Sequence, residues 1–321
     1  MKTILTTILT FTISTIAFAQ NPDKALTRVS YSFSHIQDTT QKDRPYTENM
    51  LLLVGKNASV YTSYEKINQN IRLRQRLEEQ MKNQAGNSAF SINLDNRGSK
   101  PTSAIDYFYF AKENKFFTKE RVYNNYIVEE PETKINWKMT KDTASFSGVS
   151  CKKATAYFKG RNWIAWYATE LPFQSGPWKL NGLPGLIIQA YDETKTVQFL
   201  FAGMENVVPK TDTVKVIGAK EARTTVSGSS ISAFGLGSTE SVSPYLGDII
   251  QLPKDEIRAT RKELDKLKEA RDKDPQGFMK AQAAGSGGGM ITVTGFAMPK
   301  TAGSTLPKIV INNPIELLER K

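Results

Sequence analysis

The sequence predicts a mainly β protein of the α+β class, with a curved antiparallel sheet or open barrel and two amphipathic helices packed against it. Short runs that alternate apolar and polar residues recur along most of the 321 residues, separated by polar or glycine-containing breaks. Only two stretches carry apolar residues at the helical period. A content of 39% hydrophobic and 10% aromatic residues suffices for a sizeable core.

The N-terminal residues have the pattern of a secretory signal peptide. Lys2 supplies a positive start, residues 4–18 are mostly apolar, and Ala17-Phe18-Ala19 has the form of a signal-peptidase site. We expect residues 1–19 to be removed before Gln20. The apolar part is short and rich in threonine, and no later stretch approaches a membrane span. The expected product is a periplasmic or otherwise exported chain without a transmembrane segment.

The strands follow from apolar/polar alternation. Val29, Tyr31 and Phe33 share one face opposite serines, which is typical of a half-buried antiparallel strand. The pattern is densest from 151 to 204, so we expect this region at the centre of the fold. The predicted strands or extended segments are 29–33, 50–54, 58–62, 105–111, 116–117, 122–128, 135–139, 151–158, 163–169, 185–191, 197–203, 246–252 and 309–311.

Two helices complete the predicted domain, which spans residues 20–321. Residues 64–83 place their apolar side chains on one half of a helical wheel. Residues 254–272 form a charge-rich helix with a thin apolar stripe, bounded by prolines at 253 and 275. The glycine cluster at 285–289 predicts a flexible loop over about residues 283–305.

Composition excludes several classes of function. The 43 Lys and Arg against 32 Asp and Glu give a charge of +11, but no block of like charges and no nucleic-acid motif occurs, so nucleic acid is not an expected partner. One cysteine excludes an intramolecular disulfide. One histidine and one cysteine leave too few ligands for a zinc site, and we expect no metal and no cofactor.

The sequence also gives little support for an enzyme. Cys151 and His35 are the one nucleophile–base pair available, but Cys151 opens an alternating strand and is expected to be a small buried apolar group. The glycine cluster at 285–289 lacks the Lys-Ser/Thr pair of a phosphate loop. A carboxylate-based hydrolase of envelope polymers remains the alternative, with candidates Glu129, Glu130, Glu170 and Asp192.

The stretch GPWKLNGLPGLIIQAYD, residues 176–192, interrupts the strand pattern just before a strongly apolar run. Proline fixes φ and removes a backbone donor, while glycine adopts a positive φ or admits a close neighbour. Because Lys179 is the only titratable side chain within residues 176–185, we interpret these residues as a structural hook. Its expected turn-forming residues are Gly176, Pro177, Gly182, Pro184 and Gly185.

The aromatic residues around this hook are the candidate binding surface, for a hydrophobic small molecule or a protein partner from the cell envelope. The candidates are Trp163, Trp166, Tyr167, Trp178 and Leu183. Plain core packing is the competing interpretation. A concave apolar cavity among them would favour a ligand, as in carriers of lipoproteins and other apolar ligands that the predicted sheet resembles, and a filled face would favour a partner.

The string GLPGLI at residues 182–187 resembles the signature of the GLPGLI family of exported bacterial proteins. The upstream string CKKATAYFKGRNWIAWYATELPFQSGPWKLN and the final NNPIEL at 312–317 resemble the longer pattern and the usual ending of that family. The dense match covers residues 151–192. The resemblance implies a mainly β envelope protein without an established activity, in a context of outer-membrane receptor systems.

Three Asp-Thr pairs form a separate pattern. Thr39, Thr143 and Thr213 each follow an aspartate and precede threonine, alanine or valine. This resembles the acceptor form used for periplasmic O-glycosylation in some bacteria. So short a pattern also arises by chance, so the sequence does not decide whether these threonines are glycosylated; mass spectrometry of the native protein would decide it.

Overall fold

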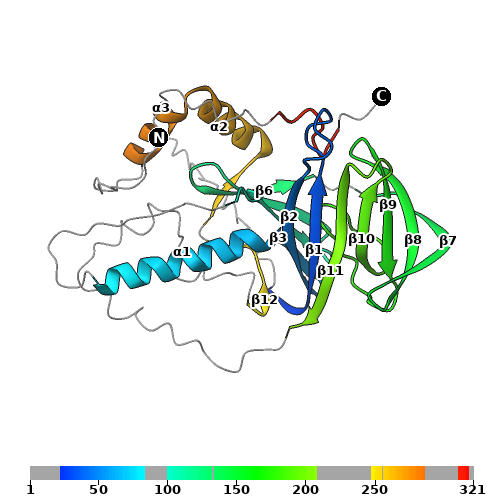
Figure 1. The fold of residues 1–321 in the computed structure, drawn as a ribbon. Coiled ribbons are helices and arrows are strands. Elements are labelled where there is room, and N and C mark those ends of the chain that lie inside the picture. Colours follow the sequence, from blue (N-terminus) through cyan, green and yellow to red (C-terminus); the bar gives the residue numbers. More distant parts are fainter. Residues whose placement is uncertain are drawn as a thin grey trace, which may run out of the picture.

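The computed structural model describes residues 22–83, 100–131, 134–207, 247–254, 256–285 and 310–317 (Figure 1). The predicted signal peptide, most of the predicted loop at 283–305, and Thr213 lie outside the described residues. The described chain is mainly β, with one large sheet and three helices, which confirms the predicted fold class.

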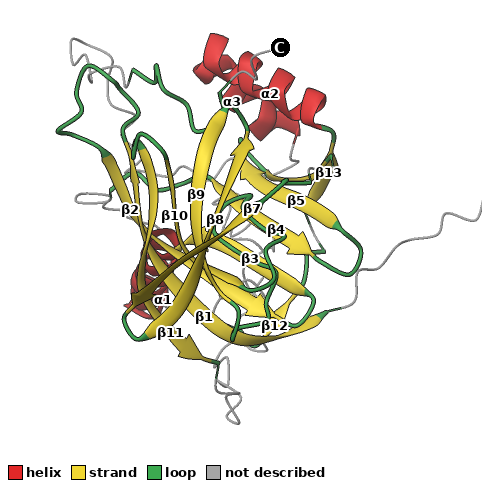
Figure 2. Cartoon of the chain, turned by 90° about the vertical axis from the view of Figure 1, so that its right-hand side faces the viewer, coloured by secondary structure: helices red, strands yellow, loops and turns green. Residues whose placement is uncertain are grey.

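One mixed sheet contains the thirteen described strands. Its order is β13-β6-β5-β4-β3-β2-β1-β11-β10-β9-β8-β7, with β12 paired to β1 beside this path. All pairs are antiparallel except β13 with β6, and the two ends are not joined, so the sheet is open (Figure 2). The strands are β1 (Asp23–His35), β2 (Tyr46–Gly55), β3 (Ala58–Ser63), β4 (Ile105–Phe110), β5 (Lys115–Arg121), β6 (Asn125–Glu130), β7 (Lys138–Phe146), β8 (Val149–Phe158), β9 (Arg161–Ala168), β10 (Leu186–Asp192), β11 (Val197–Asn206), β12 (Ile249–Ile250) and β13 (Ile257–Ala259).

Two meanders build this sheet. Strands β1 to β6 pair in chain order, as do β7 to β11, and the first and last of these, β1 and β11, join the halves through the middle. The joining register runs from Thr27 opposite Asn206 to His35 opposite Val197. Strands β1 and β11, which are distant in sequence, are therefore neighbours at the centre of the sheet.

Strand β2 shows why both faces of the sheet carry a core. Leu52 and Val54 belong to a cluster with the aromatic residues of β9 and β11, whereas Leu51 and Leu53 belong to a cluster with β4, β5 and Ile67 of the first helix. A strand covered on both sides reads as a continuous apolar run. The run at residues 50–54 has that form because the helix covers its second face.

Helix α1 (Tyr64–Asn83) has the predicted bounds. Ile67 is buried on the sheet, and the Ser63 hydroxyl accepts a hydrogen bond from the Lys66 amide at 2.9 Å, as an N-terminal cap does. Figure 1 shows the helix extending away from the strands beyond this anchored end.

Helix α2 (Arg261–Lys273) begins later than the predicted residue 254. The Thr260 hydroxyl accepts from the Glu263 backbone amide, and the Glu263 carboxylate accepts from the Thr260 backbone amide. This capping box fixes the start of the helix. Residues 257–259 before it form β13. A third helix, α3 (Pro275–Gly285), was not predicted. Pro275 is its first residue, a position where a backbone N–H has no acceptor within the helix, so proline fits there.

Three predicted strands also differ. Residues 135–137 are not strand, and β7 starts at Lys138 and continues to Phe146. Residues 246–252 contribute only the two-residue β12. Val310 and Ile311, predicted as a last strand, are about half exposed and pair with no strand of the sheet. Residues 310–317 are attached mainly through hydrogen bonds to side chains and loops, not through strand pairing. No described helix is long and apolar enough to cross a membrane.

Candidate functional site

The five candidate binding residues separate onto two sides of the sheet. Trp163 and Tyr167 alternate with Ile164 and Trp166 along β9, so the two pairs face opposite ways. The exposed fractions are 0% for Trp163 and 2% for Tyr167, and Trp178 and Leu183 are equally buried. Only Trp166 keeps a partly exposed side chain.

The buried members form a filled core. The ring of Trp163 lies 5.5 Å from that of Trp178 and 6.1 Å from that of Phe199. Two cavities in the described part of the chain have volumes of about 40 and 70 Å³, and none of the five candidates lines either. Pockets for small organic ligands measure roughly 300–1,000 Å³. Neither of these two cavities is large enough for such a ligand.

A smaller aromatic surface surrounds Trp166. The register of β8, β9 and β10 places Tyr157, Ile164, Trp166 and Tyr191 on the face opposite Trp163, next to Phe146 of β7. Trp166 Nε1 donates to the Tyr191 hydroxyl at 3.4 Å, and the Phe146 ring meets Trp166 edge-on. We call these five residues the outer patch. Tyr157 is its most accessible member, 54% exposed.

The hook at residues 176–185 is packed against the sheet. The Leu180 amide donates to the Pro177 carbonyl at 3.0 Å, and Gly182 has φ +84°, a conformation that favours glycine. A Cβ on Gly176 would lie 2.6 Å from the Leu180 carbonyl oxygen, and one on Gly185 would collide with the Ala168 backbone. These glycines allow close backbone approach, which is an architectural role.

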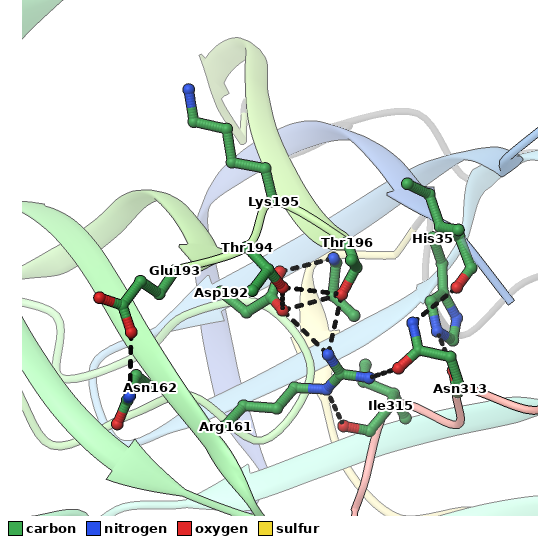
Figure 3. A network of polar contacts seen from close by, with 12 residues as sticks. His35, Arg161, Asn162, Asp192, Glu193, Thr194, Lys195, Thr196, Asn313 and Ile315 are labelled. Carbon is green, nitrogen blue, oxygen red and sulfur yellow. Dashed lines mark hydrogen bonds and ion pairs between the residues drawn. The ribbon is translucent and has the colours of Figure 1, made fainter. Parts of the chain in front are cut away.

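A buried arginine stands at the rim between the two meanders (Figure 3). Arg161 begins β9, is 5% exposed, and all five of its N–H donors have acceptors. Its Nη1 donates to Asp192 Oδ2 and Thr196 Oγ1, both at 2.9 Å. The remaining acceptors are Ile315 O at 2.8 Å and Asn313 Oδ1 and Pro314 O at 2.7 Å.

Two titratable groups beside Arg161 are shifted by this environment. Burial alone would raise the pKa of Asp192, but hydrogen bonds from Thr194, Val197 and Thr196 and the Arg161 charge outweigh it and lower that pKa. Burial, helped by the Arg161 charge, lowers the pKa of His35. His35 Nε2 donates to the Asn313 carbonyl at 2.7 Å, so the neutral ring carries its proton on Nε2.

Cys151 and His35 do not form a catalytic pair. His35 ends β1 and Cys151 lies on β8, four strands away in the sheet, which is about 19 Å at the usual strand spacing. Burial raises the pKa of the Cys151 thiol to about 11, which disfavours the nucleophilic thiolate. The cysteine is a core residue on the apolar side of its strand.

The four candidate carboxylates are dispersed. Asp192 is saturated by its partners, Glu129 pairs with Lys115 on the surface, and Glu170 is exposed in a turn. Burial would raise the pKa of Glu130, but Lys179, Arg261 and Thr118 together lower it. A glycosidase acid needs a raised pKa, so neither Asp192 nor Glu130 is prepared for that role.

Arg261 joins Glu130 to a second buried carboxylate at the start of α2. Its guanidinium pairs with Glu130 and, at 2.6 Å, with Glu120, while Lys268 also pairs with Glu120. This cluster fastens α2 to β5 and β6, together with the buried Leu264. No group of three or more His, Cys, Asp or Glu within the described ranges is placed to hold a metal ion.

Of the threonines in the three Asp-Thr pairs, Thr39 and Thr143 are exposed. The Thr39 hydroxyl donates to Asn312 Oδ1 at 3.1 Å, whereas Thr143 lies on the edge strand β7. Both side chains are accessible to a modifying enzyme, and mass spectrometry would decide whether they are modified.

Comparison with known proteins gives a family without an assigned activity. A family model described as a protein of unknown function (Porph_ging) matches residues 111–189, which include the GLPGLI string but under half of the chain. The GLPGLI family name itself is not confirmed. No curated protein matches the chain.

Among solved structures, two crystal forms of PNGF-II are similar. The P21 form has 12% sequence identity and a TM-score of 0.39 over 57% of this chain and 29% of that chain. The C2 form has 13% identity and a TM-score of 0.37 over 57% and 28%. The chain spans less than a third of the PNGF-II chains, and a likeness this distant carries no inference about activity.

Sequence reasoning missed the Arg161 cluster. Its signal was present, because Arg161 follows the Lys159-Gly160 turn and an arginine at a strand start next to apolar residues must find acceptors when buried. The acceptors come from residues 313–315, which no periodic pattern connects to the strand.

Proposed function

We propose that this protein is an exported, non-enzymatic component of the cell envelope that binds a protein partner through the outer patch. The observation that carries the proposal is the separation of Trp166 from the other four candidates. They are core, while Trp166 remains partly exposed beside Tyr191 and on the same face of the sheet as Tyr157. Partly exposed aromatic residues on a rigid sheet are the usual anchors of protein interfaces.

Two neighbouring features support this surface. Lys153 lies over the Trp166 ring and Lys195 over the Tyr191 ring, each about 6 Å from the ring centre, so the patch has a basic border. Strand β7 beside it ends the path of paired strands and is exposed along most of its length. A component of an outer-membrane receptor system is our proposed partner, on the resemblance to an exported family.

A hydrophobic small molecule is less well supported, because the two cavities of about 40 and 70 Å³ are too small for it and none of the five candidate residues lines them. The hydrolase alternative is also less well supported, because the candidate carboxylates are dispersed or neutralised. The absence of enzymatic activity and the export remain parts of the proposal.

Site-specific photo-crosslinking in the native cell tests the proposal. A photoreactive phenylalanine at Tyr157 should give one discrete protein adduct in the envelope fraction. The same residue at Tyr64, which is 42% exposed at the start of α1, is the matched control and should not give it. Trp166→Ala should abolish the adduct while the fold is retained.

Equal adducts from both positions, or none from Tyr157, would contradict the surface. Lipid analysis of the purified native protein separates the two binding hypotheses: a stoichiometric apolar molecule would show that the core opens to a ligand. Recovery of the protein from the cytoplasm with residues 1–19 still attached would contradict the export.

A further inference from the structure

The last described residues, 310–317, contact the sheet in the manner of a bound peptide. They form no strand, and Val310 and Ile311 are about half exposed, whereas Asn313 is 8% exposed. Their hydrogen bonds go to side chains and loop carbonyls of the rim. Residues 286–309 separate them from α3 in the sequence.

We propose that the rim around Arg161 is a peptide-binding site for an Asn-Asn-Pro segment, filled in cis by residues 310–317 and able to accept the same segment from a second copy of this chain. This inference goes beyond the proposed function, because it concerns a different surface and a different occupant.

Arg161 is the centre of the site. Three of its five N–H groups donate to the segment, two to the carbonyls of Pro314 and Ile315 and one to the Asn313 side chain. Without the segment these three donors would lose their protein acceptors. A planar guanidinium in this state favours a ligand rich in backbone and amide acceptors.

Both the side chain and the backbone of Asn313 form hydrogen bonds with the rim. Its Nδ2 donates to the Ile36 carbonyl at 2.7 Å, its amide to the Gln37 carbonyl at 3.0 Å, and its carbonyl accepts from His35. With the Arg161 bond to Oδ1, both ends of the side-chain amide are bound. A leucine of similar size would keep the two backbone bonds but leave Arg161 Nη2 and the Ile36 carbonyl without their side-chain partner, which gives the site its specificity for asparagine.

The far end of the segment is held by charge and shape. Glu316 pairs with Lys179 of the hook at 2.7 Å and with Lys159 at 3.5 Å. The Leu317 amide donates to the Lys159 carbonyl at 3.1 Å, and Gly160 leaves room for the Leu317 backbone and Cβ. Proline in the middle restricts the free peptide and so lowers the entropy cost of binding.

A second copy is the occupant that these contacts fit best. Exchange of an identical segment between protomers retains every contact of the cis arrangement, so it costs little in interaction energy. The cis segment is favoured in dilute protein because its effective concentration is high. Exchange should therefore become visible when the cis contact is weakened.

Complementation between two variants provides the test. The first is a chain that ends at residue 309 and so keeps the site but lacks the segment. The second is the full chain with Arg161→Lys, which keeps the segment but loses the planar fork. Mixed together, they should form a one-to-one heterodimer by size-exclusion chromatography with light scattering, whereas each alone should be a monomer.

The control adds Asn313→Leu to the Arg161→Lys chain and should lower the affinity for the truncated chain at least tenfold. No heterodimer between two variants that retain β-rich circular dichroism spectra would overturn the exchange. Equal heterodimer formation by the Asn313→Leu control would overturn the assigned specificity.

A second measurement covers misfolding of either variant. The full chain, with a protease site placed between residues 300 and 305, is folded first and then cut. A fluorescent peptide with the sequence of residues 308–317 should bind the cut chain and replace the cis segment, and the Asn313→Leu peptide should bind at least tenfold more weakly. Failure of the labelled peptide to bind after prolonged incubation would overturn the peptide-binding site.

Discussion

Arg161 and Arg261 both fasten a late segment of the chain to the sheet, but their surroundings differ. The side chains of Arg161 and Asp192 are each 4% exposed, and among the residues that the structure describes Arg161 is the one positive side chain paired with that carboxylate. Arg261 is 35% exposed, and its partners Glu120 and Glu130 have Lys268 and Lys179 as further partners. A buried ion pair is therefore vulnerable to one substitution, whereas a partly exposed network tolerates the loss of a member.

The largest expected effect is at Arg161. Arg161→Ala should lower the free energy of unfolding by about 3 to 5 kcal/mol, because it leaves Asp192 buried without a positive partner. Urea denaturation followed by fluorescence measures this. The double variant Arg161→Ala, Asp192→Ala should recover part of the loss. A loss below about 1 kcal/mol, the range of surface ion pairs, would contradict the importance assigned to the buried pair.

The next effect concerns the turn beside the Arg161 cluster. Gly160→Ala should cost roughly 2 kcal/mol, because φ is +75° and the new Cβ would lie 2.6 Å from Leu317 Cβ. Gly148→Ala is the matched control: it occupies the preceding hairpin turn at φ +85° with open space, so only the backbone cost of about 1 kcal/mol applies. Thermal unfolding of the two variants compares them. Equal losses would show that the end segment does not press on this turn.

A smaller loss is expected at the exposed network. Arg261→Ala should cost about 1 to 2 kcal/mol, between the values for surface and buried pairs, because each carboxylate keeps a lysine. The loss should shrink in 1 M salt, which screens charges near the surface. Denaturation at low and high salt tests this, and a loss as large as that of Arg161→Ala would remove the distinction between the two clusters.

The smallest effect is a pH dependence that belongs to the Arg161 cluster. His35 faces Arg161, Asp192 and the Asn313 carbonyl, and burial lowers its pKa below the ordinary value of 6.5. The unfolded chain therefore binds a proton more readily, and stability should fall as the pH drops from about 7 through this range. His35→Gln, which retains an N–H donor, should flatten the curve of unfolding free energy between pH 7 and 5. An unchanged slope in that variant would assign the dependence to other groups.

Much of the fold was predictable because apolar residues repeat at the strand and helix periods. Alternation predicted most strands, including β1 to β4 and β8 to β11, and the helical period predicted α1 with its bounds. The start of α2 is also encoded locally, since Thr260 and Glu263 have the spacing of a capping box. The proline at 253 instead favours the earlier start at residue 254 that the sequence analysis predicted. The candidate site was predicted less well. Alternation within residues 163–167 separates Trp163 from Trp166, yet it does not say which face is buried.

The sequence by itself determined the mainly β class, the local bends at the hook and the pairing of neighbouring strands, because these depend on side chains close together in the chain. Only the tertiary structure decided that β1 meets β11, that Trp163 is core while Trp166 is accessible, and that Arg161 holds residues 313–315. Those outcomes depend on contacts across more than a hundred residues. A buried donor there is satisfied by whichever distant acceptor the folded sheet brings within about 3 Å.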